Sequence, residues 1–135
     1  MAEKLQKLSV VTPQKVIYAD EVRFVKVRGT AGELGILPEH APLITSLDIG
    51  VAHIQKDNQW KKVAVHGGFM EVGGNRTIIL ANTAELADDI DVARAQRAKE
   101  RAEERLASKS ADIDLVRAEA ALKRALARLE AADAK

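Results

Sequence analysis

The sequence predicts an all-β domain followed by an all-α domain: a β-sandwich or barrel, then an antiparallel hairpin of two helices. Three observations predict this division. All eight glycines and all three prolines lie at or before Gly74. Short apolar stretches between turn residues fill the first part of the chain. The part after Glu85 is rich in Ala, Leu, Arg and Glu, which are strong helix formers. We therefore expect two domains, residues 1–84 and residues 85–135.

The first domain contains six segments in which apolar residues alternate or cluster at strand length. In chain order they are residues 5–12, 22–28, 51–55, 60–65, 69–72 and 77–81. Residues 56–59 (KDNQ) and 73–75 (GGN) have the side chains that tight hairpin turns require. Many short strands without a helical period predict a sandwich or a barrel, and the strand order stays open.

Helical spacing begins after Ile90. The first helix is predicted by a stripe of Ala95, Ala98, Ala102 and Leu106, preceded by Asp88, Asp89 and Asp91 as caps. The second helix is predicted by a stripe of Leu115, Ala118, Leu122, Leu126 and Leu129. The polar residues 108–110 (SKS) interrupt the pattern, so we expect the helices to fold back and approach closely through their alanines.

The hairpin has few large apolar residues. Full burial of each contributes at most about 1.5–3 kcal/mol. Ordering the segment costs about 1–2 kcal/mol per residue in backbone entropy, and isolated helices of this length are marginal in water. We therefore expect the hairpin to depend on docking against its own sheet domain, a partner or a ligand.

Composition excludes several classes of protein. The chain has 135 residues and no cysteine, which excludes disulfides, thiolate catalysis and cysteine–metal sites. Its apolar runs are far shorter than the roughly 20 residues of a membrane span, and its first residues lack a secretory signal. We expect no direct insertion into a membrane. A net charge of +1 and only 3% aromatic residues argue against nucleic-acid binding.

Generic catalytic and metal-binding patterns are missing from the sequence. It has no GxxxxGK[ST], no GxSxG and no HExxH motif. His40, His53 and His66 lack the spacing of metal ligands on one helix or hairpin. We interpret them as isolated histidines held by hydrogen bonds, and we expect no catalytic residue and no metal site.

Residues 32–43 (GELGILPEHAPL) predict a shaped surface loop, because glycines and prolines bracket a short apolar stretch. One interpretation is a stiff connection between strands. The other is a contact surface, since the apolar residues Leu34, Ile36 and Leu37 stand beside Glu33 and His40.

The arginines of the second domain follow helical spacing. Arg94, Arg97, Arg101 and Arg105 share one helix face, and Arg117, Arg124 and Arg128 share another. The pattern fits a solvent-exposed helix face on which glutamates are interspersed among the arginines. It fits equally well a polyphosphate site in which a folded hairpin brings Arg94 opposite Arg124 and Arg128.

Three segments resemble the epsilon subunit of bacterial F-type ATP synthase. They are the loop GELGILPEHAPL, residues 65–90 (VHGGFMEVGGNRTIILANTAELADDI) and the alanine- and arginine-rich hairpin. The resemblance implies a rotor subunit with no catalytic activity, peripheral to the cytoplasmic face of the cell membrane. Its β-sandwich would bind the gamma subunit and the c-ring, coupling proton-driven rotation to ATP synthesis. Its two helices would inhibit ATP hydrolysis by extending toward the beta subunits.

The resemblance also implies site residues. Contacts with the c-ring and gamma would fall on Glu33, Leu34, Ile36 and His40. The family's ATP-binding motif [IL]DxxRA is matched by residues 90–95 (IDVARA), and the implied ATP ligands are Glu85, Ile90, Asp91, Arg94, Ala95, Arg124 and Arg128. ATP would act as a regulatory ligand, with the part played by magnesium left open. The chain departs from the family pattern at Asn82, where Asp is usual, and at Glu39, where glycine is common.

Two alternatives remain at this point. The same rotor subunit could have a purely mechanical inhibitory hairpin that binds no nucleotide at cellular levels. Outside the family, a free-standing β-sandwich adaptor or a small-molecule enzyme is the other class, and the missing catalytic motifs argue against the enzyme.

Overall fold

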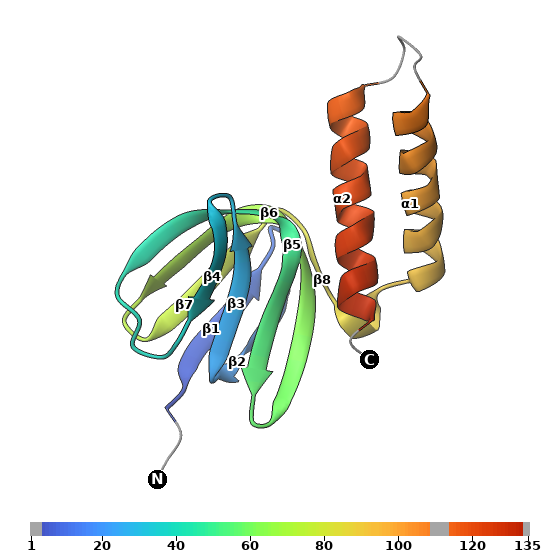
Figure 1. Cartoon of the computed structure of the whole chain (residues 1–135). Coiled ribbons are helices and arrows are strands. Elements are labelled where there is room, and N and C mark those ends of the chain that lie inside the picture. Colours follow the sequence, from blue (N-terminus) through green and yellow to red (C-terminus); the bar gives the residue numbers. More distant parts are fainter. Residues whose placement is uncertain (1–3, 109–113, 134–135) are drawn as a thin grey trace.

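The computed structural model describes residues 4–108 and 114–133. These residues form a β-sandwich with two helices beside it (Figure 1). The strands are β1 (Gln6–Val11), β2 (Val16–Val22), β3 (Phe24–Gly29), β4 (Gly32–Ile36), β5 (Leu43–Lys56), β6 (Gln59–Gly73), β7 (Arg76–Ala81) and β8 (Ala84–Leu86). A 3-10 turn, η1 (Ala87–Asp89), leads to α1 (Val92–Ala107) and α2 (Leu115–Ala132).

The strands follow one hydrogen-bonded path, β2-β1-β7-β6-β5-β3-β4, with β8 beside β6. The long strand β6 pairs with β8 through residues 63–65 and with β7 through residues 68–73, so it passes from one neighbour to the other. Although β1 and β4 are distant in this path, the side chain of Gln6 in β1 donates to the carbonyl of Ile36 in β4 over 2.8 Å. The sheet therefore closes on itself as two layers.

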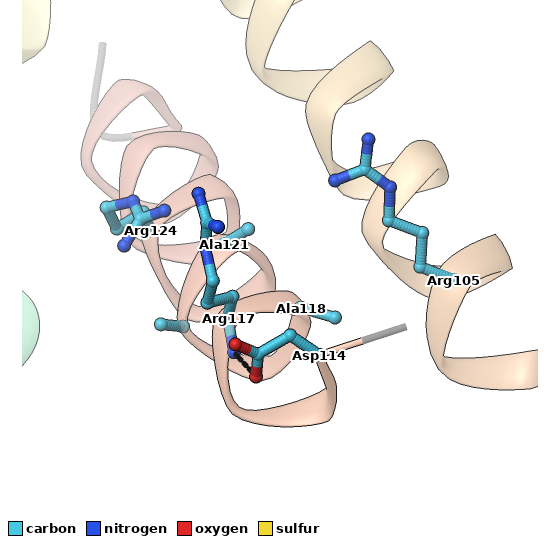
Figure 2. Close-up of a pocket in the computed structure, with 7 residues that line it drawn as sticks. Arg105, Asp114, Arg117, Ala118, Ala121 and Arg124 are labelled. Carbon is cyan, nitrogen blue, oxygen red and sulfur yellow. Dashed lines mark hydrogen bonds between the residues drawn. The ribbon is translucent and has the colours of Figure 1, made fainter. Parts of the chain in front are cut away.

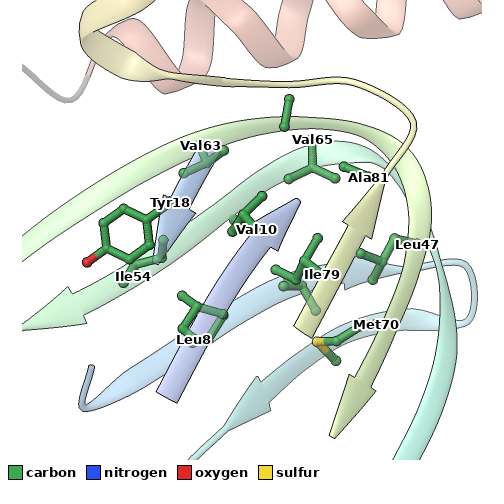
Figure 3. Close-up of a cluster of buried hydrophobic side chains, with 14 of the residues drawn as sticks. Leu8, Val10, Tyr18, Leu47, Ile54, Val63, Val65, Met70, Ile79 and Ala81 are labelled. Carbon is green, nitrogen blue, oxygen red and sulfur yellow. The ribbon is translucent and has the colours of Figure 1, made fainter. Parts of the chain in front are cut away.

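The core of the sandwich lies between these layers. Alternate residues of each strand point inward, as the period of a half-buried strand requires, and Leu8, Val10, Ile54, Met70 and Ile79 meet there (Figure 3). One buried polar pair lies on the neighbouring strands β1 and β7, since the hydroxyl of Thr77 donates to the Gln6 amide oxygen over 2.6 Å. The prediction of a β-sandwich is confirmed.

The two predicted hairpin turns are confirmed, and the strands that they join are longer than predicted. Asp57 at the β5–β6 turn has φ +54°, and Gly74 and Asn75 at the β6–β7 turn have φ +58° and +57°. The two successive positive φ angles at the β6–β7 turn are those of a type I′ turn. The segments 51–55, 60–65 and 69–72 are parts of β5 and β6 rather than separate strands.

The sequence prediction missed β2, β4 and β8. Residues 32–36 are strand β4, which pairs with β3, so the predicted loop begins only after Ile36. Two glycines in five residues give this edge strand little β-propensity of its own. Within the remaining loop Glu39 has φ +64°, a left-handed conformation that explains why glycine suits this position.

Helix α2 packs between the sandwich and α1 (Figure 1). On its sheet side, a small apolar cluster consists of Ala127, Ala131, Ala132, Ile90, Val51 and Ala64. On its other side, Ala118 and Ala125 are buried opposite Ala95 and Ala102 of α1. The small side chains let the two helices approach closely, as predicted.

The predicted leucine stripe of α2 is wrong in part. Leu115 and Leu126 are 53% and 44% exposed, whereas alanines fill both buried faces of the helix. The reason is that α2 has two neighbours, and helical spacing alone does not say which residues face them. Of the predicted break at residues 108–110, Ser108 caps α1, and Lys109 and Ser110 lie outside the described residues.

None of the helices in the described part of the chain is long and apolar enough to cross a membrane.

Candidate functional site

A cavity of about 570 Å³ lies where both helices meet the end of the sheet domain. Its lining consists of Thr83, Glu85, Asp89, Asp91, Arg94, Ala95, Ala98, Arg101, Ala121, Arg124 and Arg128. These residues come from the β8 region, η1, α1 and α2. The cavity therefore exists only while the hairpin is folded and α2 is docked on the sandwich.

The N-terminus of α1 lies at this cavity and is capped by Asp91. Asp91 is the N-cap of α1 and accepts a hydrogen bond from the backbone N–H of Arg94 over 3.0 Å. This cap fixes where α1 begins and directs its first turn toward the cavity. Arg94 and Arg101 are two helical turns apart, so they share one face of α1.

Positive charge dominates the cavity. Four guanidinium groups face three carboxylates, and two of these carboxylates are already engaged: Asp91 caps α1, and Glu85 accepts from Arg128 over 2.5 Å. Within residues 4–108 and 114–133, no carboxylate lies within ion-pair distance of Arg94, Arg101 or Arg124. Three unpaired guanidiniums in one cavity attract a polyanion, which can accept bidentate hydrogen bonds from each.

Small side chains give this cavity its space. Ala95, Ala98 and Ala121 line it between the arginines, and Ala95 is almost completely buried. Alanine contributes apolar surface without filling the volume, so the site has room for a flat apolar ring as well as for charged groups. Most small-molecule sites combine apolar walls with a few placed polar groups in this way.

The basic surface continues toward the far end of the hairpin. A second cavity of about 560 Å³ is lined by Arg105, Arg117 and Arg124 together with Asp114. Figure 2 shows Arg117 and Arg124 on α2 and Arg105 on α1, with Asp114 capping α2 through the Arg117 backbone. Since Ala121 and Arg124 line both cavities, the two cavities adjoin each other on the helical hairpin.

Comparison with known proteins identifies the family. A model of the ATP synthase delta/epsilon chain β-sandwich domain matches residues 5–87, and a model of the long α-helix domain of the same chain matches residues 88–133. The chain belongs to the ATP synthase delta/epsilon family. It is 61% identical to the ATP synthase epsilon chain of Desulforudis audaxviator over 109 residues, which cover 81% of this chain and 80% of the relative.

A second relative supports this family assignment, and a solved structure shares the fold. The epsilon chain of Pelotomaculum thermopropionicum is 58% identical over 82% of both chains. A chain in a structure of the Euglena gracilis mitochondrial ATP synthase has the same fold, with a TM-score of 0.80 at 22% identity, covering 98% of this chain and 82% of that one. As an epsilon-type chain the protein is a non-catalytic subunit of an ATP synthase.

The structure brings the expected ATP ligands of this epsilon-type chain together, with one exception. Glu85, Asp91, Arg94, Ala95, Arg124 and Arg128 all line the first cavity. Ile90 does not, because its side chain is buried between α2 and the sheet. Sequence reasoning did not select Arg101, Asp89 or Thr83 as site residues. For Arg101 the sequence held an indication, because a residue seven positions after Arg94 lies on the same face of a helix.

The expected c-ring and gamma contacts lie elsewhere, around β4 and the loop after it. Glu33 is exposed and His40 is half-buried, with its Nδ1 2.7 Å from the carbonyl of Ala41. Leu34 packs against the core, and Ile36 is fully buried within it. Because β4 turns the Ile36 side chain inward, that side chain presents no exposed surface to a partner in this structure.

Behind the cavity, Glu85 has a second neighbour that the sequence did not suggest. The ring Nε2 of His66 donates to Oε1 of Glu85 over 3.3 Å, and the ring is buried. Burial lowers the pKa of His66, and the nearby Arg128 and Arg124 lower it further. The interpretation of His66 as a hydrogen-bonded histidine agrees with this geometry.

Among the residues that the structure describes, no group of three or more His, Asp or Glu side chains could hold a metal ion.

Proposed function

We propose that this epsilon-type chain is a rotor subunit of a proton-translocating ATP synthase and that its folded hairpin binds ATP as a regulatory ligand. The observation that carries the proposal is the cavity in which Arg94, Arg101 and Arg124 have no carboxylate partner among the described residues. What separates these three arginines from a solvated helix face is that they line one cavity, where their guanidiniums can bind the same polyanion.

ATP matches the chemistry of this cavity. Its triphosphate would accept hydrogen bonds from the three guanidiniums, which suit phosphate through their planar, bidentate geometry. Its base would lie against the alanines of the wall, Ala95, Ala98 and Ala121. The volume of about 570 Å³ is within the usual range for a small-molecule site.

Binding would regulate the subunit by linkage. Because the cavity needs α1, α2 and the sheet domain together, ATP would bind only the folded, docked hairpin. A ligand at 100 times its dissociation constant stabilises the state that it binds by about 2.7 kcal/mol. That is enough to control a hairpin held by small alanine contacts. At low ATP the hairpin would open, and its arginines would dock on acidic surfaces of the beta subunits and inhibit hydrolysis.

The sandwich would hold the subunit in the rotor. Phe69 and Leu80 are cross-strand neighbours on the outer face of β6 and β7, and both are exposed, as is Ile44 on β5. An exposed apolar face of this kind favours a protein partner, and we assign it to gamma. Glu33 and His40 would meet the c-ring and gamma near β4, and the subunit would then lie peripherally at the cytoplasmic face of the cell membrane.

A second candidate keeps the rotor role and makes the hairpin purely mechanical. It is favoured by the ion pair between Arg128 and Glu85 and by the alanine cluster of α2, which hold the helix on the sheet without a ligand. In that case inhibition would depend on rotation and on contacts with beta and gamma alone.

Calorimetric titration of the isolated chain with ATP and with ADP, with and without magnesium, distinguishes the two candidates. We expect saturable ATP binding that Arg94→Ala weakens at least tenfold. Arg97→Ala is the matched control, because Arg97 lies on the same helix but does not line the cavity. Absence of heat up to millimolar ATP would support the mechanical hairpin.

A further inference from the structure

His66 lies on the face of the sheet that α2 covers. Along β6, Val63 and Val65 belong to the sandwich core, whereas Ala64 belongs to the cluster under α2. His66 follows Ala64 at the two-residue period of a strand, so it points to the same side. Its side chain is only 2% exposed. Because part of this cover comes from α2, release of the helix would expose His66 to water.

A short chain of contacts connects His66 to the helix. The ring Nε2 donates to Oε1 of Glu85 in β8 over 3.3 Å, and the same oxygen accepts from Nε of Arg128 in α2 over 2.5 Å. His66 thus orients the Glu85 carboxylate, which in turn forms the ion pair with Arg128 of α2. The other ring nitrogen, Nδ1, is buried and has no hydrogen-bond partner among the described residues, so a second proton would find no acceptor there.

The charges around His66 oppose a positive ring. Glu85 faces it from β8, and Arg128 and Arg124 face it from α2. From β5 the residue directly opposite is Ile49, which carries no charge. A protonated His66 would be a buried cation near two guanidiniums, with one carboxylate that Arg128 already occupies. Burying a charge without a full set of partners is costly.

We propose that His66 is the positioning residue for Glu85 and that its protonation releases α2 from the sheet, so that acidification opens the cavity. The part of this inference that concerns ATP rests on the proposed function, whereas the part that concerns docking does not.

The direction of the effect follows from the pKa of His66. In the docked state the pKa lies below the ordinary value of 6.5, and after release it would return toward that value. The released state therefore binds more protons, and docking weakens as the pH falls through about 6.5 toward the docked pKa. Above that range docking should not respond to this group. Each unit of separation between the two values changes the docking equilibrium about tenfold.

The docking test uses the full chain without nucleotide. Because the chain has no cysteine, Asn58→Cys and Glu119→Cys place a fluorescent donor and acceptor on the sheet domain and on α2. We expect energy transfer to be constant from pH 8 to 7 and to change steeply below about 6.5. In His66→Gln, whose amide can still donate to Glu85 but does not titrate in this range, the transition should disappear. His40→Gln is the control and should retain it.

Two outcomes would overturn the docking inference: a transition that His66→Gln retains, or no transition in the unsubstituted chain. If His66→Gln fails to fold, NMR titration of the three histidine rings in the unsubstituted chain tests the docking inference instead. The ring of His66 should titrate below 6.5 and together with the loss of contacts between α2 and the sheet. A His66 ring that titrates at or above 6.5 would refute the inference.

The nucleotide part is tested by the ratio of ATP affinities at pH 7.5 and pH 6. We expect a several-fold loss at pH 6 in the unsubstituted chain and a smaller loss in His66→Gln, which also controls for protonation of ATP itself. Equal losses would refute the link to the cavity. If ATP binds at neither pH, the proposed function fails, whereas the energy-transfer result still decides the role of His66 in docking.

Discussion

Arg128 donates from its Nε to Oε1 of Glu85 over 2.5 Å, and this ion pair joins α2 to the last strand of the sheet domain. Both side chains are about one-third exposed, at 31% and 30%, so solvent screens part of their attraction. The pair is one of few polar contacts that hold the helices on the sandwich. Its strength therefore matters for a hairpin whose apolar contacts are mostly alanines.

We predict that Glu85→Gln weakens docking of α2 by about 0.5–1 kcal/mol in the absence of nucleotide, because the amide keeps the shape but loses the charge. Hydrogen exchange of the α2 backbone measures the change. Glu119→Gln removes a carboxylate from the exposed side of the same helix and should have no effect. Equal exchange in the two variants would show that the ion pair contributes nothing.

Gly68 is predicted to tolerate no side chain. Its φ is +136°, and a Cβ there would stand 2.1 Å from the carbonyl oxygen of Leu80 on the neighbouring strand. Gly68→Ala should destabilise the chain by at least about 2–3 kcal/mol, measured by urea unfolding. Gly73→Ala in the same strand meets nothing within 4 Å and serves as the control. Similar stabilities would contradict the close approach of β6 and β7.

Ala125→Leu is predicted to force the helices apart. Ala125 is fully buried in the hairpin, so a larger side chain must displace α1. Overpacking of this kind costs about 1–3 kcal/mol. The helical signal in far-UV circular dichroism should then melt at a lower temperature. Ala93→Leu adds the same volume at an exposed position of α1 and should leave the melting temperature unchanged.

The buried pair of Gln6 and Thr77 gives a prediction for the sandwich. Thr77→Val removes the hydroxyl that donates to the Gln6 amide oxygen and leaves that oxygen unsatisfied in the core. The expected loss is about 1–3 kcal/mol in the free energy of unfolding. Thr45→Val, which removes a hydroxyl from a less buried position, is the comparison. Equal losses in the two variants would mean that burial of the pair adds no cost.

The parts of the fold that local sequence determines were predictable. Turn residues and alternating side chains marked the β5–β6 and β6–β7 hairpins, since both signals depend on neighbours along the chain. Strand β8 has three residues and exists through its pairing with residues 63–65 of β6, which no local pattern reveals. In α2 the helical period was clear, but the helix contacts both α1 and the sheet, so spacing alone could not select its buried residues.

The same distinction applies to the candidate site. The spacing of the arginines predicts that Arg94 faces Arg124 and Arg128 in a folded hairpin, and the three residues line one cavity. The neighbours of Glu85 were not predictable, because they depend on which face of β6 lies under α2. That choice is made by long-range packing, and it brings His66 to the carboxylate.

The central claim is that ATP bound by Arg94 and its neighbours keeps the hairpin from inhibiting hydrolysis. The most direct test is the rate of ATP hydrolysis by ATP synthase complexes reconstituted with this chain, measured across a range of ATP concentrations. We predict that ATP relieves inhibition by the unsubstituted chain and by Arg97→Ala, and that Arg94→Ala needs at least tenfold more ATP for the same relief. Superimposable curves for all three chains would contradict the claim.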